Sequence, residues 1–457
     1  MKSASMAIML SAAAVLLPAY GASTGDEIGQ WLAQMKGINP AVLGETELEE
    51  KSKQLDEAWR SLVAAGRPAA QRIRTEIETE LDDAYFQLSA AMVLYQIERK
   101  DADADVINVL ERTSIDDNAS QYFYLCHRIA RSRNPGILPV LARLLGNSRR
   151  VVYIDDQTEL LDPQTIATYL FGVYGAESLD TLKEAAADED AVVRANAAAL
   201  MGYFGGDSAL FVLADLLAED TVEQVRAAAA NALGQMDHPA AIAPLEAAFQ
   251  RDGNVNVRAA AAFALGELQL NSCIDPLSLA LNDISPQVRQ IAAGSLQHIG
   301  HERCAARIIH RLKVEDDPNV RLVMIGALGR IGHATANDTL VSLAESDNTE
   351  EAAAAAESIR RIEVFGPPQR EAYPDLPGEK LKPSLLQSLL KKLIESHGEG
   401  IEEHAKTIFL SAQSADLPVL EELRRSILMV VNNDTLDRLS DAGKLIRLVR
   451  RKERGLI

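Results

Sequence analysis

The stretch V-R-A-A-A-A-N-A-L-G, residues 225–234, decides the fold because it returns as V-R-A-A-A-A-F-A-L-G at residues 257–266. The Val-Arg pair occurs five times, at intervals of 31 or 32 residues. The eighth residue after the arginine is glycine in four copies and Gln297 in the other. A fixed period of this length is typical of repeat architectures, in which each unit packs on its neighbours. The arginines of this column are Arg194, Arg226, Arg258, Arg289 and Arg321.

Each period predicts two helices. Relative to the arginine, positions −1, +3, +7 and +10 are apolar, as in Val257, Ala261, Leu265 and Leu268. Steps of four, four and three place these side chains on one face of a helix. Because a single hairpin cannot bury both of its apolar faces, the pattern predicts an all-α fold, an α-solenoid of stacked hairpins. The second helices carry their own apolar column at Leu213, Leu245, Leu277, Ile308 and Leu340.

The pattern V-R-x6-(L/M)-G resembles the bacterial HEAT repeats called phycobilisome-lyase-type HEAT-like repeats, over residues 190–345. This resemblance implies a superhelix of HEAT-like hairpins. In such repeats the arginine commonly pairs with an acid in a neighbouring inter-repeat turn, and Asp190 and Asp317 stand four residues before an arginine. Asn254 and Ser285 replace the acid elsewhere, so we expect an incomplete ionic ladder. We assign the arginine column a structural role, because a half-buried guanidinium needs a partner to offset its desolvation.

Composition and periodicity divide the chain into five segments. Residues 1–21 predict a signal peptide, with Lys2 before an apolar core and small residues at the cleavage site, so we expect an exported, periplasmic or secreted protein. No later segment is long and apolar enough to predict an integral membrane span. Residues 22–145 form a divergent N-terminal helical region, and residues 146–365 form the HEAT-like solenoid, with a loop insertion at 149–156. A Pro-rich linker, 366–380, precedes a C-terminal helical segment, 381–457, which is either a cap on the solenoid or a small bundle.

Histidines and cysteines also follow the repeat. His238, His301 and His333 occupy one column, and equivalent positions of stacked helices lie about 10 Å apart, too far for shared zinc ligands at about 2 Å. We therefore predict no metal site; a weak site at His298, His301 and Cys304 is the alternative. Cys273 and Cys304 share a column with alanines, and a disulfide needs Cα atoms within about 7 Å, so both are expected to be free thiols.

Composition and motifs argue against several classes of function. The formal net charge of −20 disfavours nucleic acid as a partner. The sequence contains no nucleotide-binding, zinc-protease, hydrolase or haem-attachment motif, so no catalytic residue and no cofactor is predicted. The iron-binding His-Glu pairs of deoxyhypusine hydroxylases are represented by His301-Glu302 alone, and the similarity to phycobilin lyases lies in the stacking consensus.

The leading hypothesis is a non-catalytic periplasmic scaffold or adaptor, not an enzyme, that binds a protein partner across several repeats. In such a scaffold the second helices would line a concave surface, with Asp215, Glu219, Glu246 and Gln250 as plausible contacts. The first alternative is a lyase-like HEAT-repeat enzyme or small-ligand binder. The second is a structural subunit of an envelope complex that docks through residues 381–457.

Overall fold

The computed structural model describes most of the helical chain. The described residues are 25–36, 45–115, 119–147, 151–153, 159–161, 163–204, 206–365 and 383–395, with 401, 404, 407–408, 411–417, 419–420, 423 and 449. The predicted signal peptide and the Pro-rich linker lie outside the described residues, as does most of the predicted insertion. The chain forms two compact units, Met1–Tyr174 and Gly175–Ile457.

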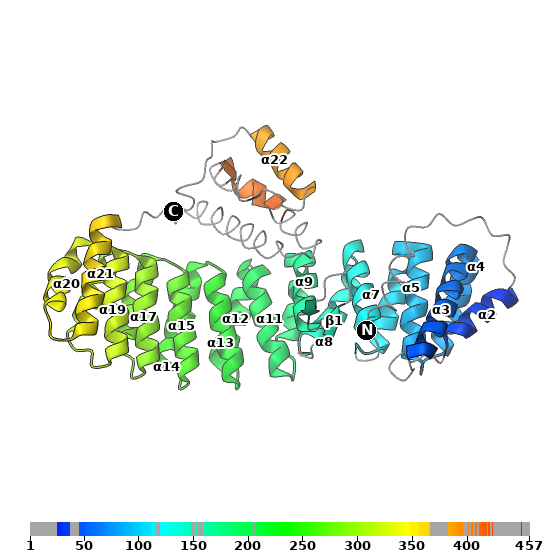
Figure 1. The fold of residues 1–457 in the computed structure, drawn as a ribbon, viewed down its shortest axis with the longest axis horizontal. Helices are drawn as coiled ribbons and strands as arrows, with labels where there is room; N and C mark the ends of the chain where they lie inside the picture. The colour runs from blue at the N-terminus through cyan, green and yellow to red at the C-terminus, as the bar shows by residue number, and fades with distance from the viewer. Residues whose placement is uncertain are drawn as a thin grey trace. The chain divides into compact units, whose positions relative to one another are not determined.

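The first unit consists of helices and one short hairpin (Figure 1). The strands of the hairpin are antiparallel, with Val151 opposite Leu161, and they fall where a loop insertion was predicted. The elements are α2 (Gly25–Met35), α3 (Glu45–Ala65), α4 (Arg67–Thr79), α5 (Ala84–Glu98), η2 (Arg99–Ala102), α6 (Asp103–Arg112), α7 (Ala119–Ser132), η3 (Pro135–Ile137), α8 (Leu138–Leu144), β1 (Val151–Tyr153), β2 (Glu159–Leu161) and α9 (Pro163–Tyr174).

The second unit alternates long first helices with shorter second helices. Its elements are η4 (Gly175–Ser178), α10 (Leu179–Ala185), α11 (Ala191–Phe204), α12 (Gly206–Glu219), α13 (Glu223–Gln235), η5 (Pro239–Ala241), α14 (Ile242–Arg251), α15 (Val255–Glu267), η6 (Asn271–Cys273), α16 (Ile274–Ala280), α17 (Pro286–Ile299), α18 (Glu302–Leu312), α19 (Pro318–Ile331), η7 (Ala334–Ala336), α20 (Asn337–Ala344) and α21 (Thr349–Phe365). It is followed by α22 (Pro383–Glu395) and η8 (Ser414–Asp416). None of the described helices is both long and apolar enough to span a membrane.

The predicted all-α solenoid is confirmed. First helices α11, α13, α15, α17, α19 and α21 each pack on the next (Figure 1), and each second helix from α12 to α20 packs on the first helix that follows it. Val225, Val257 and Val288 are fully buried on consecutive first helices, as the register requires. The apolar column of the second helices is fully buried as well, at Leu213, Leu245, Leu277, Ile308 and Leu340.

The glycine column explains how closely the first helices approach. A Cβ placed on Gly234 would lie 2.8 Å from the Cα atom of Ala264 on the next first helix. Gly202 faces Ala232 at the same distance, so only a residue without a side chain fits between these backbones. The column changes at Gln297, whose Oε1 accepts a hydrogen bond of 3.2 Å from Arg330.

A left-handed residue marks the hairpins in both units. Arg99 has φ 54° and Arg133 has φ 57°, directly after the first helices α5 and α7. The backbone N–H of Arg99 donates to the Tyr95 carbonyl oxygen and so closes the last turn of α5. The N-terminal region therefore has the same helix-hairpin repeat, although its sequence lacks the Val-Arg consensus. The positive-φ positions that recur at about one repeat are Gly66, Arg99, Arg133, Gly175, Gly206, Asp237, Gln269, Gly300 and Gly332.

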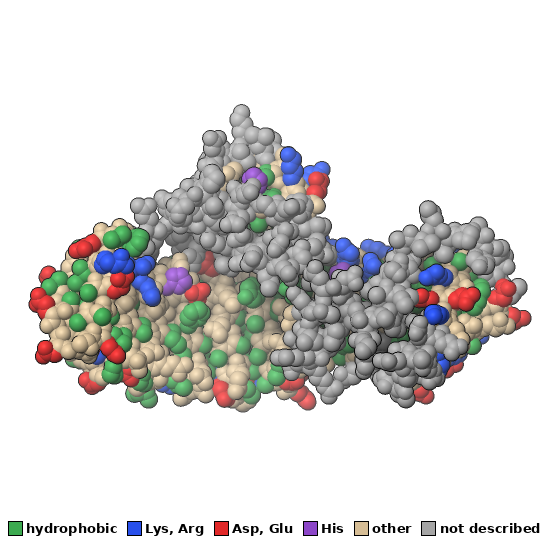
Figure 2. Space-filling model, viewed as in Figure 1, with side chains coloured by type: hydrophobic (Ala, Val, Ile, Leu, Met, Phe, Trp, Pro, Cys, Tyr) green, Lys and Arg blue, Asp and Glu red, His purple; other side chains and the backbone are tan. Residues whose placement is uncertain are grey.

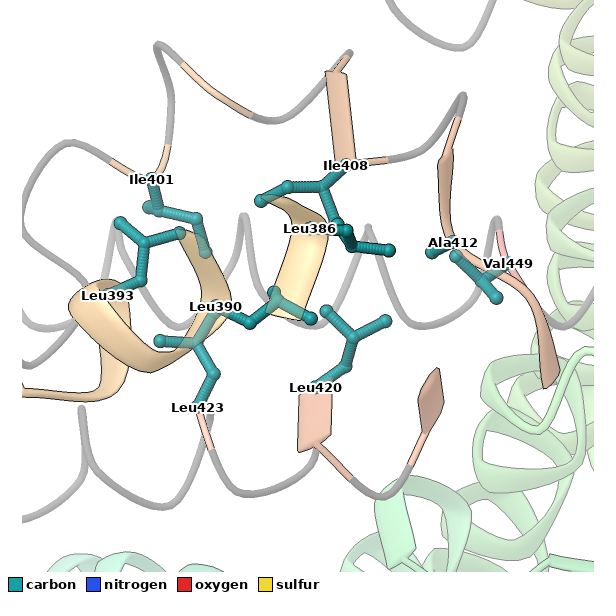
Figure 3. Packing of buried hydrophobic residues seen from close by; sticks show 9 residues of the cluster. All are labelled: Leu386, Leu390, Leu393, Ile401, Ile408, Ala412, Leu420, Leu423 and Val449. Carbon is teal, nitrogen blue, oxygen red and sulfur yellow. The ribbon is translucent and has the colours of Figure 1, made fainter. Parts of the chain in front are cut away.

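The C-terminal segment has a hydrophobic core of its own (Figure 3). Leu386, Leu390 and Leu393 of α22 supply one side of this core, at the four- and three-residue steps of an amphipathic helix. This core does not decide between the two predicted forms, the cap and the small bundle. The remaining buried members are Ile401, Ile408, Ala412, Leu420, Leu423 and Val449.

Candidate protein-binding surface

The arginine column forms a continuous ladder of hydrogen bonds. Arg226 donates from Nε and Nη2 to the carboxylate of Asp252, at 2.7 and 3.2 Å. Its Nη1 donates to the backbone carbonyl oxygen of Asp220, at 2.8 Å. Asp220 in turn accepts from Arg194, so each acid links two successive arginines. The pairs are Arg194–Asp220, Arg226–Asp252, Arg258–Asp283, Arg289–Glu315 and Arg321–Glu351.

This arrangement corrects the expected incomplete ladder. The acids four residues before an arginine are not its partners: the Asp317 carboxylate instead accepts hydrogen bonds from the N–H groups of Asn319 and Val320, which caps α19. Asn254 caps α15 in the same way, so replacing the acid there removes no ionic partner. The true partner stands 25 to 30 residues after the arginine.

The sequence did contain a signal for these partners. An acid occurs six residues before the arginine in each copy, at Asp188, Asp220, Asp252, Asp283 and Glu315. The acid four residues before the arginine was the expected partner, so this second column of acids was not predicted. Asp220, for example, follows α12 and pairs with Arg194 on α11, the first helix of the same hairpin.

Electrostatics in the ladder favour the ionised carboxylates. Hydrogen bonds from Arg194 lower the pKa of Asp220 below its ordinary value, and burial opposes the shift. At Glu315 burial is the largest single influence and raises the pKa. The hydrogen bonds from Arg289 and from the Asp317 N–H lower the pKa, and together they outweigh burial, so the net shift is downward. The Glu315 side chain is fully buried, which makes its pairing with Arg289 a requirement of the fold.

The histidine column caps helices. Nδ1 of His238 accepts from the Ala240 N–H at 3.1 Å, and His301 and His333 accept from Arg303 and Thr335 in the same way. Each of these rings therefore directs its Nδ1 at the start of the helix that follows it. Among the described residues no group of three or more His, Cys, Asp or Glu side chains is arranged to hold a metal.

The cysteines are buried in the small-residue column. Cys273 and Cys304 are fully buried free thiols, at the position where other copies have Ala209, Ala241 and Ala336. Burial raises the pKa of Cys273 to about 12. Both thiols therefore act as small apolar side chains in the core.

The predicted interface residues lie on two adjacent second helices. Asp215 and Glu219 are exposed on α12. On α14, Gln250 is exposed and donates to Oε1 of the half-buried Glu246, at 3.0 Å. Of the four, Glu246 lines a groove; the structure does not bring the others into it.

We call this hollow the second-helix groove. It is an open space of about 400 Å³ that spans the hairpins of α14, α16 and α18. Leu279 contributes an apolar side chain that is 52% exposed. Asp275 lies beside it and accepts hydrogen bonds from Arg303 at 3.2 Å and Arg307 at 3.0 Å. The groove thus combines an exposed apolar side chain with a fixed cluster of charges.

Sequence analysis missed Asp275, Leu279 and Arg307. The available signal was Leu279, because the same position holds Asp215, Ala247, His310 and Ser342 in the other copies. A leucine in a column of mostly polar or small residues indicates a surface with a local role.

The first unit has a smaller cavity of about 270 Å³ between α4 and α6. Its charged lining is internally paired, since Arg74 donates to Asp105 at 2.9 Å and to Glu98 at 2.6 Å. Its apolar lining residue, Ile77, is buried, whereas Leu279 of the second-helix groove is half exposed, so the groove is the stronger candidate for binding.

The comparisons with known proteins agree with the repeat register. The family model for HEAT repeats matches residues 179–266, 243–320, 274–360 and 305–376. No curated protein matches the chain.

Several solved structures are similar at low identity. An importin beta structure is 12% identical over 94% of this chain and 64% of its own, with a TM-score of 0.41. The CpcE–CpcF complex of phycocyanin lyase from Nostoc sp. PCC7120 is 20% identical over 50% of this chain and 93% of its own, with a TM-score of 0.30. Human deoxyhypusine hydroxylase is 16% identical over 65% of this chain and 99% of its own, with a TM-score of 0.26. No activity is transferred to this chain from these structures. The described helices thus form an all-α solenoid, and the family model for HEAT repeats matches residues 179–376.

Proposed function

We propose that the chain is a non-catalytic scaffold that binds a protein partner at the second-helix groove. The observation that carries this proposal is Leu279, which is half exposed beside the Arg303–Asp275–Arg307 cluster. Protein interfaces concentrate their binding energy in apolar anchors surrounded by polar groups. The groove has this composition and extends over three consecutive hairpins.

The form of the groove favours a macromolecular partner. Small-molecule sites enclose most of the ligand surface in a mostly apolar cavity, whereas this groove is open along the second helices. The charged cluster gives an incoming chain a defined orientation, because both arginines are held by the single carboxylate of Asp275.

We also propose export to the periplasm through the predicted signal peptide at residues 1–21. Fractionation of cells producing the full chain, beside a chain lacking residues 2–21, tests this. We expect the full chain in the periplasmic fraction, shortened at its N-terminus, and the truncated chain in the cytoplasm. Equal fractionation of the two chains would contradict export.

The binding proposal is tested with the full-length chain and two matched variants. Leu279→Asp places a charge in the groove, whereas Phe263→Asp places one on α15 at a side chain that is 50% exposed. Both variants lose a comparable exposed apolar side chain. Each protein is used to capture partners from a cell-envelope extract, and the captured proteins are quantified by mass spectrometry.

We expect Leu279→Asp to reduce capture of a specific protein by about tenfold, because a buried unpaired charge in an interface costs well over 1 kcal/mol. Phe263→Asp is expected to capture it as the unsubstituted chain does. Equal capture by both variants, with both folded by circular dichroism, would reject the groove as the binding surface.

A further inference from the structure

Basic side chains gather at the ends of two successive first helices in the first unit. Arg99 and Lys100 follow α5 and are exposed. On α7, Arg131 is exposed and Arg128 is half-buried, and Arg133 follows the helix on an exposed turn. Figure 2 shows blue side chains with a histidine at the upper end of α7. We call Arg99, Lys100, Arg128, Arg131 and Arg133 the basic edge.

The packing of α5 on α7 holds the two halves of this edge together. The Tyr95 hydroxyl of α5 donates to the backbone carbonyl of Arg128, at 3.2 Å. The Arg128 guanidinium lies 4.9 Å from the centre of the Tyr124 ring, which fixes its position. Burial raises the pKa of Tyr95, and the positive charges of Arg128 and Arg99 oppose that shift, so both guanidiniums lie near the same hydroxyl.

Two residues of the basic edge have a positive φ, which arginine rarely adopts. Arg99 and Arg133 adopt left-handed φ values of 54° and 57°. Glycine occupies the corresponding position at Gly66, Gly300 and Gly332, and Asp237 and Gln269 hold it with φ 53° and 50°. A residue with a Cβ is strained in this region, so arginine is not the choice that the backbone favours.

Several of the neighbouring carboxylates are already engaged. Glu98 and Asp105 both accept hydrogen bonds from Arg74. Asp103 is buried and accepts from the Ser132 hydroxyl at 2.6 Å. Asp101 is an exposed acid on the same turn as Lys100. Within the described residues Lys100 and Arg131 have no ion pair, so the edge carries a net positive charge.

His127 lies next to these arginines and adds no charge of its own. Its pKa is lowered to about 4, first by burial and then by the charges of Arg131 and Arg128. The imidazole is therefore neutral at physiological pH. The charge of the edge comes from its arginines and lysine, and it does not vary with pH in the physiological range.

We propose that the basic edge binds an acidic polypeptide segment. An extended peptide advances about 3.4 Å per residue, so carboxylates three residues apart match first helices about 10 Å apart. Arginine side chains bind carboxylates through two parallel hydrogen bonds. A polypeptide fits better than an anionic membrane, because a membrane plane would also repel a chain whose net charge is −20. This surface is separate from the second-helix groove and does not depend on it.

The test uses the full-length chain and a labelled oligoglutamate peptide, with binding followed by fluorescence anisotropy. Lys100→Glu/Arg131→Glu reverses two exposed charges of the edge at residues with ordinary helical backbone. The control, Arg251→Glu/Lys313→Glu, makes the same charge change at exposed residues of the second unit. Far-UV circular dichroism verifies that both variants fold.

We expect the edge variant to bind the peptide about tenfold more weakly and the control to bind as the unsubstituted chain does. Binding is also expected to weaken with added salt, as screened charges require. Equal losses in the two variants, or no binding by the unsubstituted chain, would overturn the proposal. Binding of phosphatidylglycerol vesicles in place of the peptide, lost in the edge variant, would overturn it in favour of a membrane surface.

Discussion

At the scale of single residues, the ladder is the most constrained feature of the repeat array. Each acid accepts a two-point hydrogen bond from one arginine and supplies its carbonyl to the next, as Asp252 does between Arg226 and Arg258. The sequence predicted the arginines and their structural role. The partners were not predicted, because each stands 25 to 30 residues after its arginine and not four residues before it.

Loss of one ladder arginine should destabilise the protein. Arg289→Met leaves the fully buried Glu315 carboxylate without its main partner. We expect the free energy of unfolding to fall by about 3 kcal/mol, measured by denaturant titration. Arg360→Met is the matched control, because its pair with Glu357 is exposed and should contribute little to stability. Equal effects of the two substitutions would show that burial of the ladder does not matter.

The ladder also predicts the response to acid. Its carboxyls have lowered pKa values in the folded protein, as at Asp220 and Glu351. A carboxyl with a lowered folded pKa stabilises the fold above its unfolded pKa of about 4 and loses that contribution as pH falls through the folded value. We therefore expect thermal stability to decrease steadily below about pH 4. Arg289→Met should show a shallower decrease, and unchanged stability down to about pH 2 would contradict the pairing.

At the scale of helices, the glycine column sets how the hairpins stack. The sequence predicted this column but not its reason, which is a backbone-to-backbone contact between successive first helices. In the first unit, residues 22–145 were predicted as a divergent N-terminal helical region without the Val-Arg consensus. The common feature of its hairpins is a positive φ at the residue after the first helix, as at Arg99 and Arg133. An arginine at this position does not reveal the positive φ, because arginine rarely adopts it.

Filling the glycine column should separate two helices. In Gly234→Val a side chain would meet the Cα atom of Ala264 at 2.8 Å, so the backbones must move apart. We expect a loss of at least about 2 kcal/mol in the free energy of unfolding. Gly294→Ala, on α17 with no atom within 4 Å of the added Cβ, should instead gain about 0.5–1 kcal/mol. A neutral Gly234→Val would show that the helices can part without cost.

At the scale of the whole molecule, the repeats could be predicted from the sequence, whereas contacts that depend on how the helices pack could not. The Val-Arg consensus predicted the solenoid over residues 190–345 because its columns are spelled out in the sequence. The core of the C-terminal segment was only partly predictable, since Leu386, Leu390 and Leu393 show the amphipathic helix but not which residues cover it. Of the residues that line the groove, only Glu246 was predicted as a contact. The others were missed because the stacking of three hairpins decides which exposed side chains come together.

The central claim is that each hairpin packs only on its neighbours in one repeating register. Removal of residues 258–288 deletes one full period and joins Val257 to Arg289, which restores the Val-Arg pair. Removal of residues 258–273 deletes about half a period and places a first-helix residue against a second helix. The measurement is helical circular dichroism followed through thermal unfolding. The account predicts that the full-period deletion remains helical and unfolds cooperatively, whereas the half-period deletion does not. Loss of the folded state in both deletions would contradict it.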